Sequence, residues 1–351
     1  MPTRVSQTTC LPGVTPEAIR TEGNRRNIVI LAFDGVTMID VVAWAEVFEL
    51  AEQYGRTGGL GAYKVVIVSE NGGMVRGWSG VAVEARPWAE LEGSSIDTII
   101  VAGGGPPADP PVPSPAVEWL AANAGNARRI CGVCTGTFLL AAAGLCERRR
   151  ITTHWQSRPT ILERYDLEVA ETDPVYVRDG KLWTTAGFTA GMDMALALIE
   201  EDVGHSLSVD LAGMLVMFLK RPGVQPQLSL QLSAQRSEDP DFSRLHAWIL
   251  EHIEEDLRVE RLAEQVGMTP RTFERRYTSS VGRTPARTVA EIRLEKALGL
   301  LSRNDRSLKD VARSCGFSSE QQMRRTFVRL RGGNPSDTVW PSGGGTGIGP
   351  R

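Results

Sequence analysis

The stretch VGMTPRTFERRY at 266–277 recurs near the end of the chain as CGFSSEQQMRRTF at 315–327. The offset is 49 residues between Gly267 and Gly316, and one inserted residue in the second copy makes it 50 from Phe273 and Met323 onward. Each copy predicts a short helix, a tight glycine turn and a second helix, the layout of a helix-turn-helix. Because the second helix of this motif enters the DNA major groove, two copies predict two reading helices and make DNA binding the leading hypothesis.

Each predicted reading helix has an inward and an outward face. In the first, Thr269 is expected to cap the helix, and Phe273 and Tyr277, four residues apart, to pack inward. In the second, Met323 and Phe327 take the inward positions. The outward side chains are the candidates for DNA contact: Arg271, Thr272, Glu274, Arg275, Arg276, Glu320, Gln321, Arg324 and Arg325.

The chemistry of these outward side chains suits a duplex, because Arg and Gln make bidentate contacts with guanine and adenine. We expect Thr272 and Arg276 to face phosphates and the other outward residues of the first copy to face base edges. Ser319 and Gln322 have the spacing of a capping box at the start of the second reading helix. The region 284–302 is predicted to be one long helix that holds the two reading helices on the order of 34 Å apart.

Charge separates the chain into two parts. The net charge is -3, but the residues from Asp241 onward hold 19 Lys and Arg against 14 Asp and Glu. A basic carboxyl-terminal part beside an acidic body predicts a polyanionic partner for that part alone. The five cysteines form no regular framework, which favours a reducing cytoplasm, and no apolar run predicts a signal peptide or a membrane span.

The first large block alternates strand and helix signals from residue 27 onward, whereas the block from Phe242 is helical. Such alternation predicts a flavodoxin-like, doubly wound, mostly parallel α/β sheet, followed by an all-α domain with two helix-turn-helix motifs. We expect five segments: a disordered extension at 1–26, an α/β domain at 27–220, a linker at 221–241, a DNA-binding domain at 242–340 and a disordered tail at 341–351.

A second site is predicted at Gly132-Val133-Cys134-Thr135-Gly136, between a strand and a helix. This is the G-x-S-x-G nucleophile elbow with Cys in place of Ser, and a helix amino terminus favours the thiolate. His154 and Asp40 are candidates to lie near it, and the glycines at 103–105 offer backbone N–H groups for an anion hole.

Other interpretations of these residues stay open. Cys134 could also be an inert small residue that fits a tight turn. His154 could equally be a histidine in the core whose hydrogen bonds are satisfied. Cys131 lies inside the predicted strand, so a redox pair with Cys134 is not expected, and no second Cys/His pair predicts a metal. The glycines at 103–105 lack dinucleotide-binding spacing, so no cofactor is expected.

The helical block resembles the AraC/XylS-type DNA-binding domain over residues 242–340. The motifs that carry the resemblance are Leu262-Ala263, Gly267-Met268-Thr269-Pro270-Arg271, Arg293-Leu294-Glu295-Lys296-Ala297, Val311-Ala312, Cys315-Gly316-Phe317-Ser318-Ser319 and Arg325-Thr326-Phe327. One departure is Gly332-Gly333-Asn334 before Pro335, where that family usually has a single Gly and then a bulkier residue.

The α/β block resembles the ThiJ/PfpI group of glutamine-amidotransferase-like domains. The resemblance rests on Asp40-Val41, Cys134-Thr135-Gly136-Thr137-Phe138-Leu139-Leu140, Ala143-Gly144-Leu145 and Thr153-His154-Trp155. Peptidase-like members carry His directly after the elbow Cys. Thr135 stands there, which argues against proteolysis, whereas isonitrile hydratases carry Cys-Thr and an Asp at the position of Asp40.

Together the two blocks resemble GlxA-family transcriptional regulators. That resemblance implies a homodimer that binds a double-stranded DNA operator, contacts RNA polymerase if it activates, and binds a small effector such as an amine or amino-acid derivative. The effector pocket would be lined by Asp40, Gly104, Cys134, Thr135 and His154. No catalysis is expected. The alternative is a cysteine-dependent isonitrile hydratase or amidase tethered to DNA, in which Cys134, Asp40 and His154 would be catalytic.

Overall fold

The computed structural model describes residues 25–57, 63–167, 173–218, 220–228, 232, 239–301 and 306–331. The chain divides into two compact units, one formed by Met1–Ala170 and Arg178–Lys220, the other by Glu171–Val177 and Arg221–Arg351. The predicted tail at 341–351 and most of the predicted extension lie outside the described residues. Within that extension Arg26 already belongs to the first strand.

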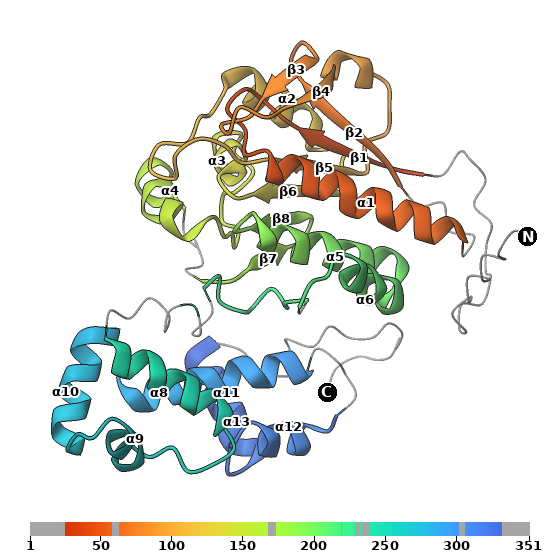
Figure 1. Cartoon of the computed structure of the whole chain (residues 1–351). Helices are drawn as coiled ribbons and strands as arrows, with labels where there is room; N and C mark the ends of the chain where they lie inside the picture. The colour runs from red at the N-terminus through yellow and green to blue at the C-terminus, as the bar shows by residue number, and fades with distance from the viewer. Residues whose placement is uncertain are drawn as a thin grey trace, which may run out of the picture. The chain divides into compact units, whose positions relative to one another are not determined.

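The first unit is built on an eight-stranded sheet (Figure 1). Its strand order is β3 (Gly73–Arg76), β4 (Ala82–Pro87), β2 (Tyr63–Ser69), β1 (Arg26–Leu31), β5 (Thr98–Val101), β6 (Arg129–Val133), β8 (Leu182–Thr185) and β7 (Tyr176–Asp179). The pairings from β4 through β2, β1, β5 and β6 to β8 are parallel, and β3 is antiparallel to β4. The predicted doubly wound, mostly parallel sheet is confirmed.

Helices cover both faces of this sheet. On one face α1 (Ile39–Thr57), α5 (Thr189–Val203) and α6 (His205–Met214) contact one another, and α2 (Ser114–Asn123) and α3 (Gly136–Ala142) lie across the sheet from them. The short helices η2 (Trp88–Leu91), η3 (Trp155–Ser157) and α4 (Arg158–Arg164) complete the unit. Coverage on both faces explains why β5, β6 and β8 are buried at every residue.

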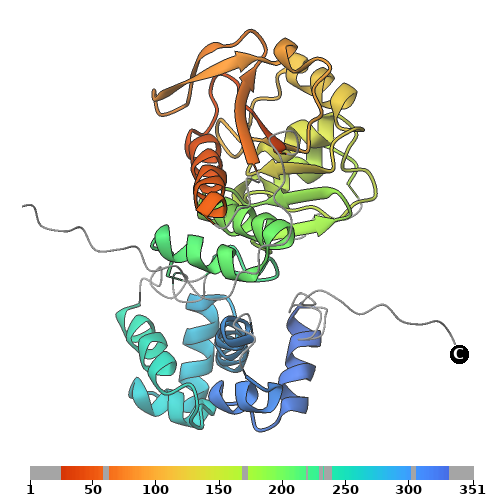
Figure 2. The same cartoon turned by 90° about the vertical axis from the view of Figure 1, so that its right-hand side faces the viewer.

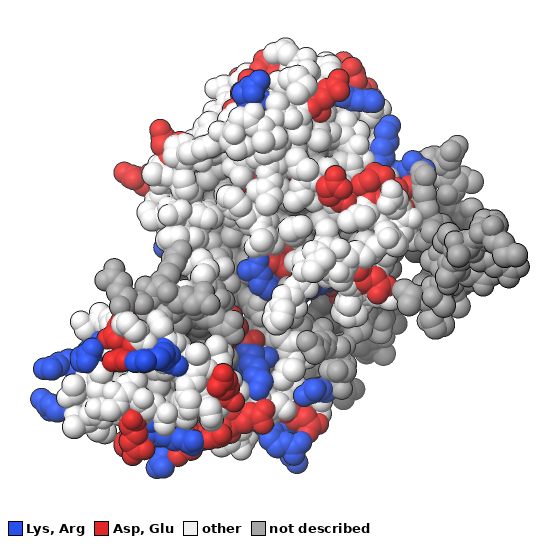
Figure 3. All heavy atoms as spheres, viewed as in Figure 1, with Lys and Arg blue, Asp and Glu red and all other residues white. Residues whose placement is uncertain are grey.

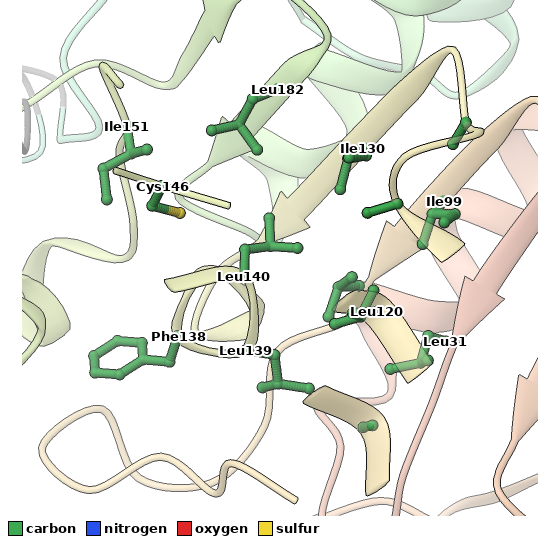
Figure 4. Packing of buried hydrophobic residues seen from close by; sticks show 14 of the residues in the cluster. Leu31, Ile99, Leu120, Ile130, Phe138, Leu139, Leu140, Cys146, Ile151 and Leu182 are labelled. Atoms are coloured by element: carbon green, nitrogen blue, oxygen red, sulfur yellow. The ribbon is translucent and has the colours of Figure 1, made fainter. Parts of the chain in front are cut away.

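The core beneath α2 and α3 shows how the sequence pattern builds this layer. Leu31, Ile99 and Ile130 from three adjacent strands point toward Leu120 of α2 and Leu140 of α3 (Figure 4). All five side chains are at most 2% exposed. Burial of this apolar surface stabilises the α3 side of the sheet, and α3 is the helix that follows the cysteine elbow.

The second unit is helical (Figure 2). It contains α8 (Pro240–Glu251), α9 (Val259–Gln265), α10 (Pro270–Val281), α11 (Pro285–Leu301), α12 (Leu308–Ser314) and α13 (Glu320–Arg331). Helix α8 begins at Pro240 rather than at 242, because the Asp239 carboxylate caps it by accepting from the Asp241 N–H. The last two residues of the predicted linker are therefore helical.

Two apolar cores share α11, which confirms the predicted long helix between the copies. Val289 and Ile292 of α11 pack with Phe273 and Tyr277 in the first core. Farther along the same helix, Leu294, Ala297, Leu298 and Leu301 pack in the second core with Met323 and Phe327. The repeat in the sequence is therefore a repeat in structure, with one helix contributing to both halves.

A buried histidine supports the first core and generates a prediction about stability. The His246 ring is hydrogen-bonded to the Tyr277 hydroxyl, its Nδ1 has no partner, and burial together with Arg283 lowers the pKa of His246 to about 4. The unfolded chain binds a proton below about pH 6.5, so stability should fall as the pH drops toward 4. Between pH 7 and pH 5 we expect a loss of about 2 kcal/mol.

Chemical denaturation of the full chain at the two pH values would measure this loss. The His246→Gln variant cannot take up that proton, so its stability should change less over the same interval. An equal pH dependence in the wild type and in this variant would contradict the assignment.

Candidate functional site

The first reading helix, α10, has the predicted cap and faces. The Thr269 hydroxyl accepts from the Thr272 N–H, and Pro270 is the first helical residue. Phe273 and Tyr277 are fully buried. Arg271, Glu274 and Arg275 are exposed, as a surface that contacts base edges requires, and the Thr272 hydroxyl bonds back to Thr269. Lys and Arg side chains project at the α10 end of the helical unit, beside acidic ones (Figure 3).

Arg276 differs from the other outward residues of α10. Its Nη2 is 2.9 Å from Asp239 Oδ2, and its guanidinium lies 5.8 Å from the centre of the Phe242 ring. The side chain therefore turns toward the start of α8. Contact with a phosphate would require Arg276 to exchange the Asp239 carboxylate for the phosphate.

The second reading helix, α13, is also oriented as predicted. Met323 and Phe327 are buried, and Gln321 and Arg325 are exposed. Glu320 and Arg324 are half-buried and form an ion pair of 2.8 Å along the helix. This pair leaves Gln321 and Arg325 as the most accessible of the four predicted contacts.

The predicted capping box at the start of α13 is only half formed. The Ser319 hydroxyl accepts from the Gln322 N–H at 3.1 Å, as expected. The Gln322 side chain, however, accepts from the Ser318 N–H at 2.7 Å, one residue before the cap. The turn is thereby fixed at Ser318, two residues after Gly316, which follows the end of α12.

The cysteine elbow in the first unit joins β6 to α3. Cys134 has φ 55°, which is unusual for a residue with a side chain. Its N–H donates to the Thr185 carbonyl at 2.9 Å, and its carbonyl accepts from the Thr153 hydroxyl at 2.8 Å. These two bonds hold the strained backbone that the sequence motif predicts.

Two glycines allow the chain to close around this cysteine. A Cβ on Gly187 would lie 2.3 Å from the Cys134 Cβ, and a Cβ on Gly103 would lie 2.9 Å from it. Neither position has room for a side chain. The loops after β5 and β8 therefore meet at the elbow.

The predicted anion hole at 103–105 is wrong. The Gly103 N–H bonds to Asp40, the Gly104 N–H donates to the Thr135 hydroxyl at 2.8 Å, and the Gly105 N–H donates to the Gly35 carbonyl at 3.1 Å. The Thr135 hydroxyl also donates to the Gly104 carbonyl at 2.9 Å. Buried backbone groups pair internally wherever they can, so these donors are already occupied.

Asp40 lies at the elbow and is only 1% exposed. Its Oδ1 accepts from the Phe188 N–H at 2.9 Å, whereas its Oδ2 is buried without a hydrogen-bond partner. Burial raises the pKa of Asp40 to about 7, against the opposing effect of the hydrogen bonds from Phe188, Gly103 and Cys134. A carboxyl group with one unmatched oxygen is thus held beside the cysteine.

The expectation that the Cys134 thiolate is favoured is wrong. Burial raises the pKa of Cys134 well above its usual range, and the neighbouring Asp40 carboxylate raises it further. The hydrogen bonds from Thr135 at the start of α3 lower it less than burial raises it. The thiol is therefore protonated at neutral pH and is a poor nucleophile.

His154 and Trp44 each present a polar atom without a partner. The His154 ring lies 5.8 Å from Trp155 and 6.1 Å from Phe188, its Nδ1 is unpaired, and burial lowers its pKa. Among the described residues no hydrogen bond joins His154 to Cys134. Trp44 lies one turn after Asp40 on α1, fully buried, with its Nε1 unpaired.

Sequence reasoning missed the role of Phe188 at this site. Phe188 has φ 51°, is 46% exposed, and donates its N–H to Asp40 at the start of α5. Only the topology brings this loop to α1, because the two residues are 148 positions apart. Its one sequence signal is Gly187 directly before it.

Comparison with known proteins identifies both halves. A family model described as the DJ-1/PfpI family matches residues 26–201, and one described as a helix-turn-helix domain matches residues 262–339. The HTH-type transcriptional regulator CdhR of Pseudomonas aeruginosa is 30% identical over 78% of this chain and 81% of its own length. The HTH-type transcriptional regulator GlxA of Rhizobium meliloti is 28% identical over 91% of this chain and 98% of its own length.

An enzyme is also similar, over a shorter stretch. An isonitrile hydratase of Pseudomonas putida is 33% identical over 36% of this chain and 54% of its own length. In the described part of the chain, no helix has the length and apolar character needed to cross a membrane. No group of three or more His, Cys, Asp or Glu residues arranged to hold a metal ion is found there either.

Burial of Asp40 predicts a measurable loss of stability at alkaline pH. Its folded pKa is raised to about 7 from 3.8, so the stability present at low pH is lost as the pH rises toward and through 7. The Asp40→Asn variant carries no charge and retains an acceptor for the Phe188 N–H. Relative to the wild type it should therefore gain roughly 2 to 3 kcal/mol between pH 5 and pH 8.

Thermal or chemical denaturation of the α/β unit within the full chain at both pH values measures this gain. Glu46→Gln, which removes an exposed carboxyl from the same helix, is the matched control and should leave the difference near zero. A pH-independent difference between Asp40→Asn and the wild type would show that the carboxyl is not held in this way.

Proposed function

The chain belongs to the DJ-1/PfpI family and, like its relatives of nearly full length, is a helix-turn-helix transcriptional regulator; from this premise we propose that α10 and α13 read its operator and that a small cation at Asp40 controls them. The observation that carries the first part is the structural repeat. Both reading helices bury their inward side chains in a core and present polar and basic ones outward.

Arg271, Arg275, Gln321 and Arg325 are the proposed base-reading residues. They are exposed on the two helices that follow the glycine turns, where a helix-turn-helix places its recognition residues. Thr272, Glu274, Glu320 and Arg324 flank them. Arg276 would join a phosphate contact after leaving Asp239.

The effector proposal rests on the unmatched Oδ2 of Asp40. A buried carboxylate is stabilised by a cation or by hydrogen-bond donors, and the site supplies neither to this oxygen. Trp44 Nε1, one turn along the same helix, is a donor without an acceptor. An ammonium group donates to Asp40, and an amino-acid derivative also carries an oxygen that can accept from Trp44, so such a derivative fits both groups whereas a simple amine fits Asp40 alone.

Not every predicted effector contact keeps the same role. Gly104 and Thr135 are buried and bonded to each other, so we propose that they form a wall of the pocket rather than contacts to the ligand. His154 and Cys134 are proposed to line it. Phe188, half-exposed between His154 and Asp40, is proposed to cover the entrance.

The alternative enzymatic function is less well supported. A hydratase or amidase would need a thiol that is ionised or readily deprotonated. The Cys134 thiol is held protonated, although the Asp40 carboxyl is hydrogen-bonded to it and would be the base of such an enzyme. The relatives that match most of the chain are regulators, whereas the hydratase matches about a third of it.

Homodimerisation is proposed for the α/β unit. Helix α6 buries Leu211 against its own unit, so this side chain is not available to a second copy. Val209 remains 46% exposed, Val216 88% and Phe218 fully exposed, and we propose that these apolar side chains contact a second copy. Contact with RNA polymerase and a cytoplasmic location stay predictions.

The reading assignment is tested by changing both exposed arginines. Arg271→Ala with Arg325→Ala should weaken binding to a duplex selected by the protein from random sequences by about 100-fold, since each bidentate contact contributes about 1–3 kcal/mol. Fluorescence anisotropy at fixed salt measures the affinity. Arg244→Ala with Arg258→Ala removes the same charge from exposed residues that do not belong to α10 or α13 and should have a much smaller effect; equal losses would reject the assignment.

The effector assignment is tested by a thermal-shift screen of primary amines and amino acids against the full chain. A ligand that pairs with Asp40 should raise the melting temperature of the wild type and leave Asp40→Asn unchanged. Cys134→Ser should retain most of the shift, because the thiol is not the charged group. A screen in which every stabilising ligand acts equally on Asp40→Asn would remove Asp40 from the site.

A further inference from the structure

Arg293 of α11 makes an unusual contact within the helical unit. Its Nε donates to the Ile253 carbonyl at 3.2 Å, and its Nη2 donates to the Glu255 carbonyl at 2.7 Å. Both carbonyls lie just after α8, and Ile253 is buried in the first core. One guanidinium therefore holds the end of the first copy's supporting helix against α11.

The turn of the second copy reaches the same carbonyl. Gly316 has φ 73°, and a Cβ there would lie 2.1 Å from the Ile253 carbonyl oxygen and 2.9 Å from the Arg293 Nε. Gly267, its counterpart in the first copy, has φ 64° and would meet nothing within 4 Å. The two glycines match in sequence, but only Gly316 also needs the space that a side chain would fill.

A groove of roughly 750 Å³ lies beside this contact. Its walls are the segment 254–260 on one side and the segment 313–318 with α13 on the other, and Arg293 is part of its lining. The groove separates the segment 254–260 from the segment 313–318 and α13. Apart from α11 itself, the contact of Arg293, Ile253 and Gly316 thus joins the first copy to the second at this point.

We propose that Arg293 and Gly316 lock the two helix-turn-helix copies at one separation, and that this lock determines which spacing between DNA half-sites the protein accepts. The proposal rests on the assignment of α10 and α13 as reading helices. A change of one base pair moves a half-site by about 3.4 Å along the duplex and rotates it around the axis. A rigid pair of helices rejects that change, whereas a hinged pair adapts to it.

The environment of Arg293 supports a positioning role. Burial lowers its pKa, so placing a cation here is unfavourable unless its hydrogen bonds are kept. Two backbone carbonyls accept hydrogen bonds from Arg293, and together they fix the orientation of the guanidinium plane. A single ion pair with a flexible side chain would leave that orientation free. The side chain is thereby committed to the joint between the copies and not to DNA.

The test uses the full chain and a duplex of about 30 base pairs that the wild type selects from random sequences, long enough for two half-sites. Two further duplexes have one base pair added or removed between the half-sites. The wild type should prefer the selected spacing by about tenfold or more, the scale of a lost base contact. Arg293→Met should reduce that preference to about twofold, because the altered duplexes should bind this variant more tightly than they bind the wild type.

Two matched controls separate the lock from simple loss of charge or of glycine. Lys296→Met removes one cation from the same helix, where the ammonium is 3.2 Å from the exposed Glu254 carboxylate, and should keep the wild-type preference. Gly267→Asn should also keep it, because Asn tolerates a left-handed backbone and that site is open. Gly316→Asn should behave like Arg293→Met.

The outcomes distinguish the two levels of the argument. If Arg293→Met, folded by circular dichroism, keeps the full spacing preference, the lock is overturned while the reading assignment stands. If Arg293→Met or Gly316→Asn fails to fold, Arg293→Lys is tested instead, because one ammonium group cannot donate to both carbonyls. An unchanged spacing preference in Arg293→Lys would again refute the lock. If the Arg271 and Arg325 variant still binds the selected duplex as tightly as the wild type, the reading assignment itself fails.

Discussion

Close approach of backbone to backbone, at positions where a side chain would not fit, underlies both sites of this protein. In the α/β unit Gly187 and Gly103 let two loops close on Cys134, and in the helical unit Gly316 rests on the Ile253 carbonyl. Each contact brings together segments that are distant in the chain. The arrangement of the buried carboxyl in one unit and of the two reading helices in the other follows from these contacts.

The two units use burial differently. In the helical unit almost every buried side chain is apolar, and α11 serves two cores, which suits a rigid scaffold that presents an outer surface. In the α/β unit Asp40 and Trp44 are buried and His154 is half-buried, and each of the three has a buried polar atom that lacks a partner. Unmatched buried polar atoms lower stability. The helical unit also holds such an atom, the Nδ1 of His246 in its first core.

The elbow also shows how one motif serves a protein of a different class. The strained turn, the small flanking residues and the following helix of a nucleophile elbow are all present at Cys134. The electrostatic conditions are not, because burial and a neighbouring carboxyl favour the neutral thiol. A regulator can thus retain the geometry of a catalytic turn without the ionised thiol that catalysis requires.

The repeat, the helix caps and the inward aromatic residues of the reading helices were readable from sequence, because they depend on local spacing and on the periodicity of a helix. The same holds for the parallel sheet and for the strained turn at Cys134. What depended on distant partners was not readable: the occupied N–H groups at 103–105, the raised pKa of Cys134, and the Asp239 partner of Arg276.

Gly267 and Gly316 show which properties follow from the sequence and which depend on the tertiary structure. Sequence alone determined that both end a short helix with a left-handed turn, since that requirement is local. Only the tertiary structure decided that Gly316 also meets the end of α8 and Arg293, because that contact depends on how α11 packs into two cores at once.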